Sequence, residues 1–93
     1  MTAPATARAE LDQALELDPQ VALRDEDFGA LAYHYGTRRL VFLKSRRLVD
    51  IVRSLGEHES GLSAVAALTE PAEQDRYAAA LEQLLGSGVV VAR

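Results

Sequence analysis

The chain has 93 residues, of which 48% are hydrophobic and 26% are charged, with a formal net charge of -4 and no cysteine. A chain of this length is expected to form one small domain, and the lack of cysteine excludes disulfides, thiolate nucleophiles and thiolate metal sites. No stretch approaches the roughly 18 continuous apolar residues of a membrane span, and the N-terminus lacks a signal-peptide pattern, so we expect a cytoplasmic protein with no membrane partner.

Charge is distributed unevenly along the chain. Residues 28–56 contain six of the ten basic residues and a single acid, Asp50, whereas residues 1–27 and 57–93 are both acidic. A basic middle between acidic ends has two interpretations. Either the folded surface compensates its own charges, or the basic segment docks an acidic partner.

The N-terminal region has the weakest pattern in the sequence. The stretch MTAPATARAELDQALELDP, which ends at Pro19, indicates a tail or a weak helix. We therefore assign residues 1–14 to a flexible tail or weak helix and residues 15–93 to the domain. The following segment, QVALRDEDFG, predicts a short strand and an acidic turn.

The segments ALAYHY and RRLVFL are rich in apolar, β-branched and aromatic residues and predict a β-hairpin. The dipeptide Gly-Thr at 36–37 fits a two-residue type II′ turn between them. That turn places Tyr35 opposite Arg38 and Leu31 opposite Phe42. The ladder between these two pairs follows from the same register.

Both faces of this hairpin are apolar. The period of two places one set on one face and a second set on the other: Leu31, Tyr33, Leu40 and Phe42 against Ala30, Ala32, Val41 and Leu43. In a two-layer domain the helices cover only one face of the sheet. The N-terminal segment, a second copy or a bound peptide is therefore expected to cover the other face or the edge.

Three helices are predicted after the hairpin. Ser45 fits the N-cap of the first helix, which Gly56 ends, and Ser60 opens a short second helix. Pro71 fits the first turn of the third helix, and Gly86 is expected to close it. The last segment, VVVA, is either an added strand or a packed plug.

Three strands followed by three helices predict an α+β fold, winged helix-turn-helix-like, with a three-stranded antiparallel sheet. The stretch FGALAYHYGTRRLVFLKSRRLVDIVRSLGEH, followed by RYAAALEQLLGSGVV, resembles PqqD-like peptide-recognition domains, and among them the small precursor-peptide chaperones of mycofactocin biosynthesis. The resemblance covers residues 28–90. The hairpin stretch is its specific part, because many winged helices end in a sequence similar to LLGSGVV.

The resemblance implies a non-catalytic peptide chaperone without a cofactor. Such domains hold the leader of a ribosomal precursor peptide as a strand added to strand 39–43, in a groove walled by helix 72–85, and present it to a radical SAM maturase. Their leaders tend to be acidic, which suits the basic segment. A homodimer is left open as a further partner.

Carried onto this sequence, the resemblance assigns peptide binding to Arg38, Arg39, Leu40, Val41, Phe42, Leu43, Tyr77, Leu81 and Leu84, and electrostatic docking to Lys44, Arg46 and Arg47. The orientation of the strand has two solutions. The family pattern turns Val41 and Leu43 inward, whereas side-chain bulk favours an inward Leu40 and Phe42.

Other functions have less support in the sequence. His34 and His58 lie in different predicted elements and Ser45 and Ser60 stand at helix starts, so neither a metal site nor nucleophilic catalysis is indicated. Winged-helix DNA binding is one alternative, but the helices that would read DNA supply only Arg76, and no nucleic-acid partner is expected. A small structural dimer is another alternative, and it predicts that no pathway peptide binds.

Overall fold

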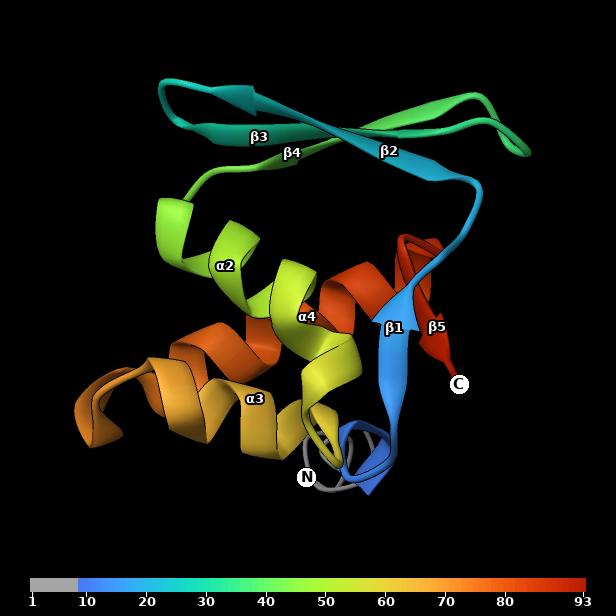
Figure 1. The fold of residues 1–93 in the computed structure, drawn as a ribbon. Coiled ribbons are helices and arrows are strands. Elements are labelled where there is room, and N and C mark those ends of the chain that lie inside the picture. The colour runs from blue at the N-terminus through green and yellow to red at the C-terminus, as the bar shows by residue number, and fades with distance from the viewer. Residues whose placement is uncertain (1–8) are drawn as a thin grey trace, which may run out of the picture.

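A three-stranded antiparallel sheet lies over a group of helices, and a second, two-stranded ladder stands beside them (Figure 1). The structure, a computed structural model, describes residues 9–93. The elements in chain order are β1 (Leu15–Leu17), β2 (Val21–Glu26), β3 (Gly29–His34), β4 (Arg39–Leu43), α2 (Arg46–Ser54), the 3₁₀ turn η1 (Leu55–Glu57), α3 (Gly61–Leu68), the 3₁₀ turn η2 (Pro71–Glu73), α4 (Gln74–Ser87) and β5 (Val90–Ala92). The predicted α+β class and the three-stranded antiparallel sheet are confirmed.

The expected N-terminal tail falls partly on residues 1–8, which lie outside the described part of the chain. Residues 9–11 form a helical turn, and Leu11 is fully buried in the hydrophobic core. The Gln13 carbonyl accepts the N–H of Gly61, which begins α3. The domain boundary assigned at residue 15 stays a prediction.

The first strand was not foreseen from the sequence. β1 pairs antiparallel with β5, with Glu16 opposite Val91, so the interpretation as tail or weak helix is wrong for Leu15–Leu17. A three-residue strand carries little local pattern, and its partner lies at the other end of the chain. The expectation that VVVA adds a strand is confirmed for Val90–Ala92.

The hairpin has the predicted register and a different turn. β3 and β4 pair with Leu31 opposite Phe42, as expected. The type II′ turn is wrong, because Gly36 has no positive φ and Arg38 adopts the left-handed conformation, with φ 62°. The Arg38 N–H donates to His34 O at 2.7 Å, and the buried His34 Nδ1 accepts the N–H groups of Gly36 and Thr37 at 3.1 and 3.2 Å. A four-residue loop organised by a histidine therefore replaces the two-residue turn.

The sheet turns its small residues toward the helices. Ala30, Ala32 and Leu43 are fully buried, whereas Leu40 and Phe42 are exposed. Of the two orientations left open by the sequence, the family pattern is the one adopted. The two alanines leave space for α2 to pack against β3, and the larger side chains remain on the opposite face.

The helices begin at the predicted serines. The Ser45 side chain caps α2, and Ser60 forms a capping box with Ser63 at the start of α3. The predicted end of the third helix is wrong by two residues: α4 continues through Gly86 to Ser87, and Gly88 closes it with a left-handed φ of 86°. No helix within residues 9–93 is long and apolar enough to cross a membrane.

Gly29 fixes the connection between β4 and α2. Its φ is +150°, and a Cβ at this position would overlap Leu43 O and lie 2.8 Å from Ser45 N. Only glycine lets the two backbones approach so closely. The start of β3 thus sets the path of the chain as it leaves the sheet.

Candidate functional site

The first component of the candidate site is the free edge of β4, which is the last strand in the order β2-β3-β4. His34 O points toward β4, because it accepts the Arg38 N–H, and His34 is the register partner of Arg39. Backbone groups of successive residues point to opposite edges of a strand. Leu40 and Phe42 therefore direct their N–H and C=O groups to the free edge, which no other strand of residues 9–93 occupies.

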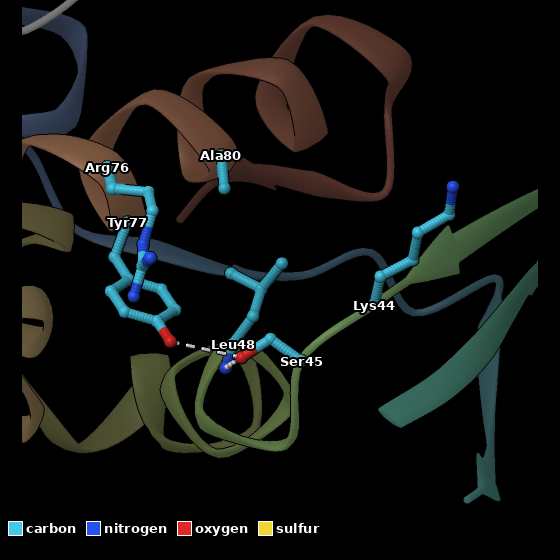
Figure 2. A pocket seen from close by; sticks show the side chains of 6 residues that line it. All are labelled: Lys44, Ser45, Leu48, Arg76, Tyr77 and Ala80. Carbon is cyan, nitrogen blue, oxygen red and sulfur yellow. Dashed lines mark hydrogen bonds between the residues drawn. The ribbon is translucent and has the colours of Figure 1, made fainter. Parts of the chain in front are cut away.

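The second component is a surface pocket of about 440 Å³ at the end of β4 (Figure 2). Its lining residues are Lys44, Ser45, Leu48, Arg76, Tyr77 and Ala80. Figure 2 shows that three of them belong to the connection after β4 and the first turn of α2, and that the other three face them from α4. The pocket therefore lies between the start of α2 and α4, next to the end of β4, and none of its lining residues belongs to β4 itself. The groove that the resemblance implies along β4 stays a prediction.

Tyr77 connects the two walls of this pocket. Its hydroxyl lies 3.2 Å from Ser45 Oγ, and the same Oγ accepts the Leu48 N–H in the N-cap of α2. The Arg76 guanidinium lies over the Tyr77 ring, 5.1 Å from its centroid, a geometry in which cation and ring attract. The pocket thus combines an apolar wall, a hydroxyl pair and a cation.

The basic segment divides into compensated and uncompensated residues. Arg46 and Arg53 both contact Asp25, at 3.7 and 3.0 Å, and Arg47 contacts Glu73 at 3.8 Å. Three further cations have no ion-pair partner among the described residues and stand at the two ends of β4: Arg38 and Arg39 at its start, and Lys44 directly after its end. The first interpretation, a surface that compensates its own charges, therefore applies to the arginines of α2. Docking of an acidic partner stays a prediction for the three cations without an ion-pair partner.

The site residues expected from the resemblance fall into two groups. Several are exposed or half-buried and lie on the edge strand or its flanks: Arg38, Arg39, Leu40, Val41, Phe42, Lys44, Arg46 and Arg47. Leu43, Leu81 and Leu84 belong to the core, and Tyr77 is buried at the pocket. The core leucines can support the wall of a groove, but they have almost no surface with which to contact a ligand.

Sequence reasoning missed four residues of the pocket lining: Ser45, Leu48, Arg76 and Ala80. Ala80 follows Tyr77 by three residues and Arg76 by four, which are the spacings of neighbours on one helix face. That signal was present in the sequence. Ser45 was recognised only as a cap, because its contact with Tyr77 joins residues far apart in the chain.

No cluster of three or more metal-ligating side chains occurs in the part of the chain that the structure describes. The chemistry available at the site therefore consists of backbone hydrogen bonds along β4, apolar contacts and positive charge. These features suit the binding of an extended segment.

One protein family matches most of this sequence. The model of the peptide chaperone MftB family aligns with residues 14–91. The chain belongs to this family. A peptide chaperone MftB of Mycobacterium tuberculosis is 41% identical over 102 residues, covering 100% of this chain and 94% of the relative. The Mycolicibacterium smegmatis peptide chaperone MftB is 46% identical over 81 residues, covering 86% of this chain and 79% of the relative.

A solved structure shares the fold of this MftB-family chain. Lasso peptide synthetase B1, determined in complex with the leader peptide, superimposes with a TM-score of 0.63 over 84% of this chain and 98% of the synthetase. The two sequences are 20% identical. At that identity the likeness concerns the fold.

Proposed function

We propose that this protein is a non-catalytic chaperone that binds the leader of a ribosomal precursor peptide by adding it as a strand to the free edge of β4. The relatives are named peptide chaperones, and the structural neighbour was solved with a leader peptide. The observation that carries the proposal is an unpaired strand edge with a pocket at one of its ends, where Lys44 has no ion-pair partner, and with two further uncompensated cations, Arg38 and Arg39, at the other end.

The edge would supply sequence-independent affinity and the pocket would supply selectivity. Leu40 and Phe42 offer N–H and C=O groups to an incoming backbone, as in other strand-addition complexes. Successive side chains of an added strand point to opposite faces. Every second peptide side chain would therefore point toward the α4 side, where Tyr77 and Ala80 form the wall.

We further propose that the bound leader is delivered to a radical SAM maturase in mycofactocin biosynthesis. The support for this step is membership of the MftB family and the resemblance to PqqD-like domains. A chaperone in this role would hold the leader extended, because an extended segment keeps the rest of the precursor free to reach the enzyme.

Titration with the leader of the cognate precursor should test strand addition directly. In amide NMR spectra we expect the largest shifts on Leu40 and Phe42, and further shifts on pocket residues such as Tyr77. The N–H groups of Leu40 and Phe42 should also gain protection from hydrogen exchange, because they become hydrogen-bonded. A scrambled leader of the same composition is the control. Shifts confined to α3 and the β1–β5 ladder would contradict the proposal.

Charge reversal on the edge should slow peptide association. Arg39→Glu replaces a cation that has no ion-pair partner and should lower the association rate by about tenfold at low ionic strength. The effect should shrink at physiological salt, where the Debye length is about 8 Å. Arg24→Glu makes the same charge change on the far edge strand β2, where Arg24 pairs with Glu26 at 3.0 Å, and is the control for net charge in stopped-flow measurement. Equal effects of the two variants would show that only net charge matters.

A further inference from the structure

The face of the three-stranded sheet opposite the helices is apolar along β3 and β4, and on β2 it carries Arg24 and Glu26, which form an ion pair with each other. We call it the outer sheet face and define it by six side chains: Phe28, Leu31, Tyr33, Tyr35, Leu40 and Phe42. It holds four of the five aromatic residues of the chain. In Figure 1 the described helices all lie on the other side of the sheet.

Three of the four aromatic side chains of this face are exposed, Tyr33 is half-buried, and the four rings form two contacting pairs. The exposed fractions of Tyr35, Leu40 and Phe42 are 62, 59 and 56%. The Phe28 and Phe42 rings lie 5.8 Å apart, and Tyr33 and Tyr35 form an edge-to-face pair at 5.0 Å. A contiguous apolar patch of this kind on a soluble domain marks an interaction surface.

The two ends of the outer sheet face carry opposite charges. Asp27 lies in the turn between β2 and β3, and Arg38 lies in the loop between β3 and β4. Both are exposed, and neither has an ion-pair partner within the described residues. Since β3 runs from one to the other, the charges stand about 20 Å apart along the strand direction.

We propose that the outer sheet face binds a second copy of this chain, face to face. The two-fold axis lies between the two sheets, parallel to their planes and perpendicular to the strands. This axis reverses the strand direction, so Asp27 of each copy faces Arg38 of the other. A two-fold axis parallel to the strands would instead place like charges together. The antiparallel arrangement therefore buries the two aromatic faces against each other and forms two Asp27–Arg38 pairs between the copies.

The size of the outer sheet face determines the affinity that we expect for the dimer. Three strands about 4.8 Å apart and about 20 Å long present a small face, which lies at the lower end of specific interfaces. We therefore expect a dimer with a dissociation constant in the range of about 1–100 μM. The free edge of β4 lies in the plane of the sheet, so the dimer leaves it accessible and does not depend on the proposed peptide function.

Two single charge reversals provide the decisive experiment. In Asp27→Arg both ends of the face are positive, and in Arg38→Asp both are negative, so each variant alone should dimerise at least tenfold more weakly than the wild type. Mixed in equal amounts, they should form a heterodimer in which both pairs are opposite in sign. Sedimentation velocity from about 1 to 500 μM, without peptide, measures all four samples. Aspartate tolerates the left-handed conformation at position 38, and thermal melting of each variant checks the fold.

Each outcome of these measurements either supports or overturns the proposed dimer. Dimerisation of the wild type, loss in both single variants and recovery in the mixture support the proposal, as does weakened dimerisation of Tyr35→Ala, which trims the apolar face. A wild type that stays monomeric at all concentrations overturns it and leaves the face to a different protein partner. Single variants that dimerise like the wild type, or a mixture that does not recover, overturn the antiparallel arrangement. The sedimentation experiment contains no peptide, so its outcome is distinguishable from that of the peptide titration, which follows the backbone N–H groups of the β4 edge as leader is added.

Discussion

Replacing Leu81 by alanine is expected to lower the free energy of unfolding by about 2–5 kcal/mol. Leu81 lies in the middle of α4 and its side chain has an exposed fraction of 0%. The substitution removes buried methyl groups and leaves a cavity that surrounding side chains fill only in part. Because a domain of this size has little stability in total, urea denaturation should show a large decrease in the transition midpoint.

Tyr77→Phe is the matched variant one turn earlier on the same helix. Tyr77 is 9% exposed, so its ring is part of the core, and truncation to alanine would destabilise the domain as well. Removing only the hydroxyl keeps the ring and deletes the contact with Ser45. We expect a small change in stability and a roughly two- to tenfold loss of peptide affinity, as for one hydrogen bond at a binding pocket. An unchanged affinity, with Leu81→Ala still folded and binding normally, would contradict a peptide groove on α4.

Phe42→Pro is expected to reduce peptide affinity at least about tenfold while the domain stays folded. Proline removes an N–H that points to the free edge, and its ring blocks the approach of a neighbouring strand. Proline is tolerated on edge strands when the missing N–H faces solvent. Calorimetric titration with the leader, at protein concentrations below self-association, measures the effect.

Phe42→Ala and Val41→Pro are the controls for this result. Phe42→Ala removes the same ring but keeps the backbone N–H, so it should lose less affinity than the proline variant. Val41 pairs with Ala32 on the side that faces β3, so Val41→Pro should destabilise the fold itself. Equal peptide affinity of Phe42→Pro and Phe42→Ala would mean that the peptide does not use this N–H, and strand addition to β4 would be wrong.

The sequence by itself determined the features that depend on neighbouring residues. The alternation of apolar residues predicted the register of the hairpin, with Leu31 opposite Phe42. Ser45 and Ser60 marked the starts of two helices, since a serine hydroxyl can accept the free N–H groups of a first helical turn. The resemblance to PqqD-like domains predicted a site at strand 39–43 and helix 72–85, and a pocket lies at the end of β4, between the start of α2 and α4.

The tertiary structure decided the features that depend on distant residues. Both faces of the hairpin were apolar, so only the packing of α2 against the alanines of β3 selected Val41 and Leu43 as the inward pair. The strand at Leu15–Leu17 exists because β5, at the other end of the chain, supplies its partner.

The pairing of the basic residues also depends on residues that are distant in the sequence. No pattern in the sequence indicated which cations in residues 28–56 are compensated, because Asp25 and Glu73 reach Arg46, Arg47 and Arg53 from other elements. The composition states how many charged residues there are, whereas the folded structure determines which of them form ion pairs. The fold pairs the arginines of α2 and leaves those along the edge of β4 without a partner in the described chain, because an edge strand has no neighbour on its free side.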